Sequence, residues 1–201
     1  MKLFLEVLLA FLGLFSRAAS ELCPVADTVS TASNCAELFF SGFRLDGDNT
    51  QLIDGQRVNE NTDFNRNYGQ MGQGFGSPAG NVWLGLDFVN WITQQSTTEL
   101  RVDLTACNGT AANATYGTFA VGNVASLYQL TVNHFRDGLL GDALLVFNGR
   151  SFSASDADHD THTTTNCAAH FDCPWWHSNC FSICLNGPYP TSDNCTVPSL
   201  S

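Results

Sequence analysis

The sequence predicts an α+β domain in which a small antiparallel sheet is followed by a loop-rich region held by disulfides. Three segments, 99–104, 113–121 and 127–132, alternate polar and apolar residues with the period of a strand. Asn-Gly and Gly-Asn turns separate them, which is typical of an antiparallel meander. Four of the eight cysteines lie between residues 167 and 184, where no periodicity is seen.

The elements before this meander are shorter. In the first strand of the meander, Leu100, Val102 and Leu104 are predicted to face a core. Residues 81–93 combine apolar positions that suit a short buried strand leading into a helical turn. Residues 46–67 and 69–80 are rich in Asp, Asn, Gln and Gly, and we predict them to be loops.

Composition places the chain among single folded domains. It has 201 residues, of which 44% are hydrophobic, and its 15 Phe and 4 Trp supply enough apolar area for a core. The formal charge of −11 excludes nucleic acid as a partner, because phosphate binding depends on clustered Lys and Arg. Anionic membrane surfaces are disfavoured for the same reason.

The N-terminus resembles a secretory signal. Lys2 is followed by an apolar run over 3–15 and by small residues that end at Ser20, so we predict that residues 1–20 are cleaved. The run is short for a membrane span, and no membrane insertion is predicted. Residues 21–34 are predicted to form a polar arm ahead of a domain over 35–201. The chain is therefore expected to be secreted.

Secretion makes disulfides the expected state of the cysteines, although their pairing cannot be read from the spacing. Two sequons place possible N-glycans at Asn108 and Asn113, predicted to lie on exposed loops. A third, at Asn194, contains a cysteine and is the weakest.

The sequence feature that most clearly indicates a binding site is an acidic loop. Asp156, Asp158 and Asp160 alternate along an irregular segment, and such carboxylates can converge on Ca²⁺ together with backbone carbonyls. The segment lacks the glycine and glutamate of an EF-hand. A solvated acidic loop is the simpler alternative. Zinc is an alternative metal, because several His and Cys follow the acidic loop in the sequence. However, the cysteines of secreted chains usually form disulfides and are then not available to a metal.

Trp175 and Trp176 stand together between Cys167 and Cys180. Adjacent indoles can fill a core or form the floor of a sugar-binding pocket, because indole faces stack on apolar sugar surfaces. No nucleophile elbow, His-Glu-x-x-His or phosphate loop is present, so the sequence does not support an enzyme.

Ordered motifs across residues 56–189 resemble the fibrinogen-related domain, the C-terminal module of fibrinogens, ficolins, tachylectins and angiopoietins. The matching segments are Gln56-Arg57-Val58, 63–68, Gly74-Phe75-Gly76, 82–85, 99–104, 116–119, 130–132, 147–149, Phe152-Ser153, Asp156-x-Asp-x-Asp160, 166–168, Trp175-Trp176, Asn179-Cys180 and 185–189.

This resemblance implies a fibrinogen-like fold with a calcium and ligand subdomain. It implies that Asp158 and Asp160 bind Ca²⁺ through their side chains, next to Asp156, with carbonyls near His162 and Thr164. It also implies a Cys167–Cys180 disulfide, and an Asn179–Cys180 peptide that is cis in many members.

The resemblance also implies a pocket for acetylated groups, whose residues here are Phe171, Trp175, Trp176, Asn179 and Phe181. Phe181 replaces the histidine that many members have after the second pocket cysteine, which removes a polar group from the pocket.

The match is incomplete at both ends. The family has a Gly-Gly-Trp-Thr-Val strand and a further cysteine before the position of Gln56, and a strand-bearing segment after that of Tyr189. An unprotected sheet edge or exposed apolar patch is therefore expected.

We predict a secreted, calcium-dependent, lectin-like recognition protein that binds glycans or acetylated ligands, as in innate immunity. The alternatives are an extracellular protein-binding or structural module and a non-functional truncated product, with a secreted hydrolase more distant.

Overall fold

The computed structural model describes residues 2–9, 50–77, 79–106, 109–180 and 183–189. The predictions for the arm over 21–34, for Asn108 and for Phe181 lie outside these residues.

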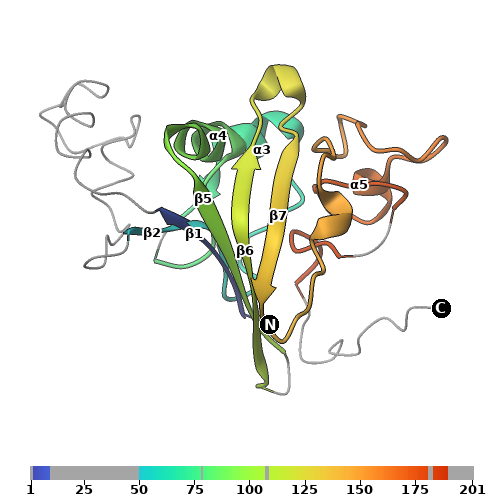
Figure 1. The fold of residues 1–201 in the computed structure, drawn as a ribbon. Helices are drawn as coiled ribbons and strands as arrows, with labels where there is room; N and C mark the ends of the chain where they lie inside the picture. The colour runs from blue at the N-terminus through green and yellow to red at the C-terminus, as the bar shows by residue number, and fades with distance from the viewer. Residues whose placement is uncertain (1, 10–49, 78, 107–108, 181–182, 190–201) are drawn as a thin grey trace, which may run out of the picture.

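The described residues form one seven-stranded antiparallel sheet in the order β3-β4-β2-β1-β5-β6-β7, with short helices beside it (Figure 1). Its strands are β1 (Lys2–Leu9), β2 (Thr50–Arg57), β3 (Phe75–Gly76), β4 (Val82–Trp83), β5 (Thr98–Thr105), β6 (Ala111–Val121) and β7 (Leu130–Asp137). The helices are α3 (Tyr68–Gln73), α4 (Leu86–Gln95) and α5 (Cys167–His170), with 3-10 turns η1 (Val124–Ser126) and η2 (Leu145–Phe147). This architecture confirms the predicted fold class.

The predicted meander is present as β5, β6 and β7. Leu100 and Val102 of β5 are buried and Leu104 is half-buried, in keeping with the alternation of the sequence. The third strand starts later than predicted, at Leu130. Leu127 and Tyr128 adopt φ of 56° and 50°, in the left-handed region, and so belong to the turn that follows η1.

Three elements form in segments predicted to be loops: β2, α3 and the two-residue strand β3. β2 lies within residues 46–67, where its pairing with β1 overrides a polar sequence without periodicity. α3 forms despite two glycines because a capping box starts it: the Asn67 side chain accepts from the Gln70 N–H, and the Gln70 side chain accepts from the Asn67 N–H. The predicted helical turn after β4 is the ten-residue helix α4.

Strand β1 lies inside the sheet, between β2 and β5. Leu3 is opposite Arg57 of β2 and Leu104 of β5, and pairing with both neighbours continues to Leu9. The same residues belong to the predicted secretory signal. A chain cleaved after Ser20 would lack this strand, and β2 and β5 would each have an unpaired edge.

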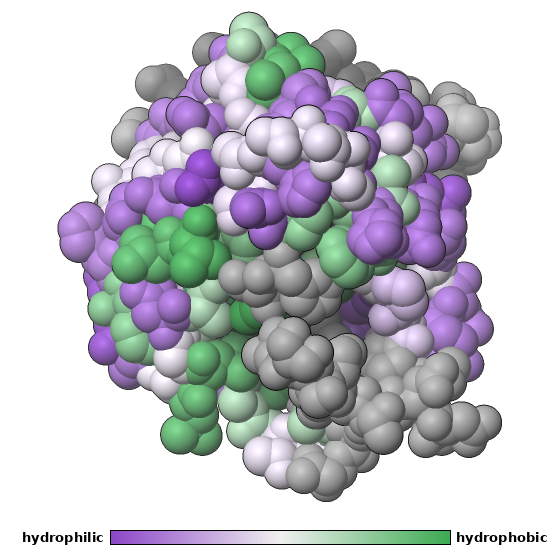
Figure 2. Space-filling model, turned by 90° about the vertical axis from the view of Figure 1, so that its right-hand side faces the viewer, coloured by the Kyte–Doolittle hydropathy of each residue, from purple (hydrophilic) through white to green (hydrophobic). Residues whose placement is uncertain are grey.

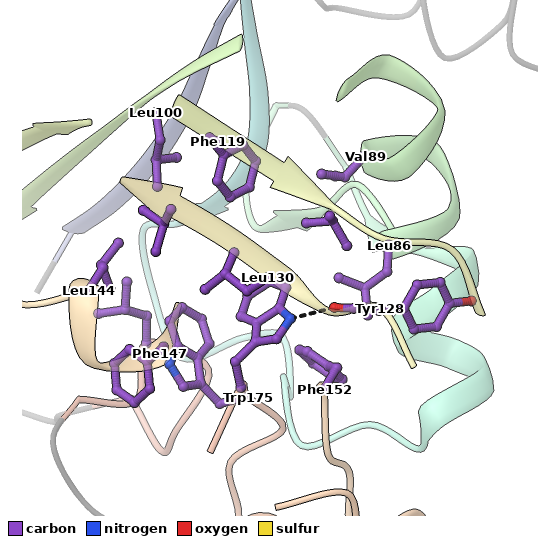
Figure 3. Packing of buried hydrophobic residues seen from close by; sticks show 14 of the residues in the cluster. Leu86, Val89, Leu100, Phe119, Tyr128, Leu130, Leu144, Phe147, Phe152 and Trp175 are labelled. Atoms are coloured by element: carbon purple, nitrogen blue, oxygen red, sulfur yellow. Dashed lines mark hydrogen bonds between the residues drawn. The ribbon is translucent and has the colours of Figure 1, made fainter. Parts of the chain in front are cut away.

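The core lies between the sheet, α4 and the C-terminal loops (Figure 3). Leu86 and Val89 of α4 face Phe119 and Leu130 of the meander. The Tyr128 hydroxyl donates to Asp87 Oδ1 at 2.6 Å. Burial and this carboxylate raise the pKa of the Tyr128 phenol far above its ordinary value, so the bond is kept through the neutral range.

Gly85 joins β4 to α4, and we expect Gly85→Ala to destabilise the domain. Its φ is +98°, and a Cβ there would lie 2.6 Å from the Gly72 carbonyl oxygen and 2.7 Å from Gly74 N. The backbone conformation alone would cost about 1–3 kcal/mol. Gly80→Ala is the matched control, because a Cβ at Gly80 has nothing within 4 Å. Urea denaturation would measure both, and equal midpoints for Gly85→Ala and wild type would contradict the expectation.

The outer surface of the C-terminal region is mostly hydrophilic, with separate apolar spots (Figure 2). Leu139 is 85% exposed, and Leu145 and Val146 are about half exposed. These residues follow β7 in the chain. No helix in the described part of the chain is long and apolar enough to cross a membrane.

Candidate functional site: the acidic loop, its disulfides and a polar cavity

The predicted calcium loop begins after buried Phe152 and ends at Cys167, the first residue of α5. Ser153 and Trp175 form an isolated antiparallel bridge, with N···O distances of 2.9 and 3.1 Å. Ala154 pairs with Ala157 in the same way. The first bridge fixes the start of the loop against the segment that carries the two tryptophans, and the second closes a tight turn within the loop.

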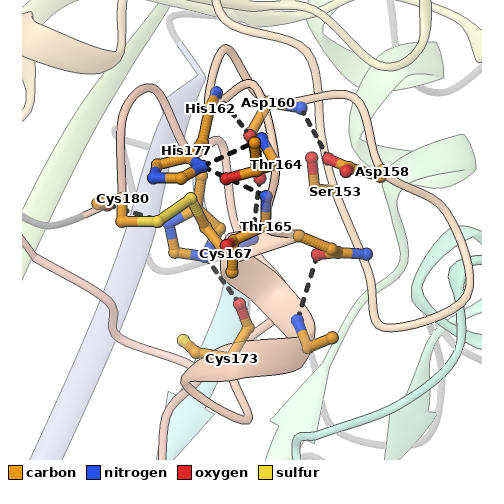
Figure 4. The surroundings of a disulfide bond; sticks show 12 residues. Ser153, Asp158, Asp160, His162, Thr164, Thr165, Cys167, Cys173, His177 and Cys180 are labelled. Atoms are coloured by element: carbon orange, nitrogen blue, oxygen red, sulfur yellow. Dashed lines mark hydrogen bonds between the residues drawn. A yellow bond between two sulfur atoms is a disulfide. The ribbon is translucent and has the colours of Figure 1, made fainter.

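Asp160 organises the loop (Figure 4). Its Oδ1 accepts from the His162 N–H at 2.7 Å, and its Oδ2 accepts from the Cys167 N–H at 2.8 Å. Asp158 Oδ1 accepts from the Asp160 N–H at 3.3 Å, and the Asp158 side chain is exposed. The two carboxylates therefore lie on one turn of chain, with Asp160 tying that turn to the first cysteine.

His162 uses its ring to shape the same turn. Its Nδ1 lies 3.3 Å from the Thr164 N and 3.1 Å from the Thr165 N, so it accepts from both N–H groups. The Nδ1 of His162 is thus engaged with the backbone of its own turn.

Asp156 does not share this arrangement. Its Oδ1 accepts from the Tyr68 N–H at 2.8 Å, at the start of α3. Asp156 therefore also anchors the loop to a helix through Oδ1, a contact that leaves its second carboxylate oxygen outside this hydrogen bond.

The donor set of this loop suits calcium and not zinc. Two carboxylates and nearby carbonyls give only oxygen, the ligand that Ca²⁺ prefers. Within the described residues, no three His, Cys, Asp or Glu side chains lie close enough to hold a metal. The potential zinc ligands are engaged elsewhere: His159 Nδ1 is 2.7 Å from the Phe152 carbonyl oxygen, and Cys167, Cys173, Cys180 and Cys184 are in disulfides.

Two disulfides close the segment that follows. Cys167 pairs with Cys180, as the resemblance implies, and Cys173 pairs with Cys184, which the sequence left open. Their Cα atoms are 5.1 and 6.3 Å apart, within the usual range. The Asn179–Cys180 peptide is trans, contrary to the pattern of many members, since no cis bond occurs in the described part of the chain.

The buried ring of His177 lies between these disulfides. Its Nε2 is 2.8 Å from the Cys173 carbonyl oxygen, and its Nδ1 is 3.3 Å from that of Cys180. His177 thus connects one cysteine of each disulfide through its imidazole. The sequence signal was only a histidine among cysteines, which did not distinguish this role from metal binding.

Of the predicted pocket residues that the structure describes, only two have accessible side chains. Trp175 and Trp176 are 2% and 3% exposed and pack in the core, where the Trp176 Nε1–H donates to the Tyr128 carbonyl at 2.7 Å. We therefore correct their assignment as pocket walls. Phe171 is half-buried and Asn179 is exposed, so both are accessible near the Cys167–Cys180 disulfide.

Asn113 lies in β6, opposite Asp103 of β5, and is half-buried. Asn113 therefore belongs to the strand predicted over 113–121, and not to the exposed loop expected for its sequon.

A second site, which the sequence did not indicate, is a polar cavity of about 390 Å³. Its lining comes from segments far apart in the chain and includes Arg57, Glu60, Asp63, Asn65, Asp172 and Tyr189. Only the fold reveals it, because the lining residues between 57 and 65 are more than a hundred positions from those between 172 and 189.

Comparisons with known proteins agree with this architecture. The family "fibrinogen beta and gamma chains, C-terminal globular domain" matches residues 27–198. Ficolin-3 from Homo sapiens is 36% identical over 142 residues, which cover 71% of this chain and 47% of that protein. Tenascin-R from Gallus gallus is 41% identical over 137 residues, covering 68% of this chain and 10% of that protein.

The fibrinogen-like globe domain of human ANGPTL6 superposes with a TM-score of 0.67 at 30% identity. The match covers 71% of this chain and 63% of that one. The chain spans less than half the length of the curated relatives named above. The family consists of non-enzymatic recognition and structural domains. The chain belongs to the fibrinogen C-terminal globular domain family.

Proposed function

We propose that this chain is a secreted, calcium-dependent recognition domain that binds glycans or other acetylated ligands. The observation that carries the proposal is the geometry of Asp160, whose carboxylate joins the acidic turn to Cys167. A cation at this turn would therefore act on the same backbone that closes the Cys167–Cys180 loop. The similarity to ficolin-3, a member of a lectin group, supports a sugar or acetylated ligand.

In this proposal Asp158 and Asp160 hold Ca²⁺ together with the carbonyls of His162 and Thr164. The ion supplies charge neutralisation and a fixed centre for the oxygen ligands. Asp160 positions the turn through its two backbone contacts, and Asp158 contributes an exposed carboxylate. The ligand then contacts the accessible surface of Phe171 and Asn179, beside the disulfide.

The first test is thermal unfolding of the secreted protein with calcium and with chelator. A ligand that binds only the folded state adds about 2.7 kcal/mol at a hundredfold excess over Kd. We expect calcium to raise Tm in wild type, and we expect Asp158→Asn to abolish most of this shift. The substitution keeps the Oδ1 that accepts from Asp160 N–H, so the turn itself is retained.

Asp137→Asn is the control, because it removes the same charge from an exposed residue at the end of β7. An equal calcium shift in Asp158→Asn and Asp137→Asn would remove Asp158 from the metal site. A wild-type melt indifferent to calcium would contradict the calcium-dependent function as a whole.

A second candidate is an extracellular protein-binding or structural module. The burial of both indoles favours it, since Trp175 and Trp176 offer no face to a sugar. The 41% identity with tenascin-R is compatible with this role. A glycan array that shows no binding, together with capture of an extracellular protein partner, would support this candidate over the first.

A further inference from the structure

The polar cavity contains two buried hydrogen-bonding atoms that have no partner in the protein. Arg57 is 5% exposed, and its Nη1 donates to the Gly187 carbonyl while its Nε–H has no acceptor. Asn65 donates through Nδ2 to Asp172 Oδ1 at 2.9 Å, but its Oδ1 has no donor. Native proteins leave few such atoms unpaired, so an unpaired donor and acceptor in one cavity wall call for a partner.

The rim of the cavity is acidic. Glu60, Asp63 and Asp172 are exposed carboxylates around it, and Arg57 is the one cation that we find in its lining. Because the whole chain carries −11, its field also favours the approach of a positive group. The site therefore selects for a cation at its mouth.

The cavity is larger than a single metal ion requires. The three carboxylates surround a space of about 390 Å³, and the described residues hold no set of acidic or histidine side chains close enough for a metal. This volume is within the range of sites for small organic ligands. An organic cation on a flexible stem can reach the rim while its other end lies deeper.

One apolar wall is rigid. The Arg57 guanidinium lies 4.7 Å from the centre of the Phe64 ring and 5.3 Å from that of Tyr189. The Tyr189 hydroxyl donates to the Val58 carbonyl at 3.1 Å, which fixes the ring at the cavity. Tyr189 and Pro188 therefore provide apolar surface for a methylene stem.

We propose that this cavity binds a lysine- or arginine-containing peptide segment. The basic side chain lies among Glu60, Asp63 and Asp172. The peptide carbonyl accepts from Arg57 Nε–H, and the peptide N–H donates to Asn65 Oδ1 after a small side-chain adjustment, since both atoms are now covered. A peptide supplies cation, acceptor and donor together, which a simple amine or a neutral sugar does not. This inference is independent of the calcium-dependent function.

The test uses the full secreted chain in a chelating, low-salt buffer, so that the acidic loop plays no part. N-acetyl-lysine N-methylamide is titrated while the Arg57 Nε–H and Asn65 side-chain resonances are followed by NMR. We expect both to shift, and we expect n-butylammonium, which has the cation alone, to bind more weakly. Raising the salt should weaken binding, because exposed charges are screened.

Glu60→Gln and Asp172→Asn should each weaken binding about two- to fivefold, which is the usual range for exposed charge pairs. Asp172→Asn keeps the Oδ1 that accepts from Asn65. Asp137→Asn, with the same charge change outside the cavity, should leave the affinity unchanged.

Three outcomes would overturn the proposal. One is equal affinity for wild type and both rim variants, and another is equal affinity for N-acetyl-norleucine N-methylamide, which lacks the charge. The third is a shift of the same resonances by N-acetylglucosamine, which would make the cavity a sugar site.

Discussion

Trp176→Ala is expected to lower the free energy of unfolding by about 3–5 kcal/mol, the cost of deleting a large buried aromatic side chain. Trp176 is 3% exposed, and its ring lies 4.9 Å from that of Phe152, edge to face. The variant also leaves the Tyr128 carbonyl without the indole N–H that donates to it. Denaturant unfolding followed by circular dichroism would measure the loss.

Trp176→Phe separates the two contributions, because it keeps an aromatic ring and removes only the N–H and part of the volume. We expect it to lose clearly less stability than Trp176→Ala. A ligand-facing tryptophan would give the opposite pattern, with unchanged stability and reduced binding. Near-wild-type stability in Trp176→Ala would therefore contradict its place in the core.

Removal of the Cys167–Cys180 disulfide should cost about 3 kcal/mol, the value expected for a closed loop of this size, with a sequence separation of 13. The double variant Cys167→Ser/Cys180→Ser should in addition lose most of the calcium-induced rise in Tm. The reason is local: Cys167 N–H donates to Asp160 Oδ2, so freeing the cysteine loosens the acidic turn.

Cys173→Ser/Cys184→Ser is the matched control, with a sequence separation of 11. It should lose a similar amount of stability and keep the calcium shift, since neither cysteine contacts the acidic turn. Equal loss of the shift in both double variants would mean that calcium acts through the whole subdomain and not through Cys167.

The sequence predicted the meander well because a strand with one buried face repeats every two residues, as Leu100 and Val102 do. It missed β2, whose polar residues become a strand through pairing with distant β1, a contact that no local pattern encodes. It missed α3 because glycines suggested a loop, whereas Asn67 and Gln70 cap a helix.

In the candidate site, too, local sequence could predict some features, while others depend on contacts between distant residues. Spacing could indicate that Asp158 and Asp160 share one turn, since neighbouring residues stay together in the fold. It could not show that Asp156 contacts Tyr68, which is distant in sequence. The sequence could not show whether Trp175 and Trp176 are buried or face solvent. It could not show the cavity beside Arg57 either, because the residues that line it are more than a hundred positions apart.

The central position of β1 sets an order of events during synthesis. Its first partner, β2, begins at Thr50 and its second, β5, at Thr98, so about half of the chain must emerge before the strand can be enclosed. At translation rates of roughly 5–20 residues per second, that interval lasts several seconds. Throughout it, Lys2–Leu9 is an exposed apolar segment open to the targeting machinery. If residues 1–20 act as the predicted secretory signal, export and enclosure in the sheet compete for the same residues, and the secretion machinery has the earlier opportunity.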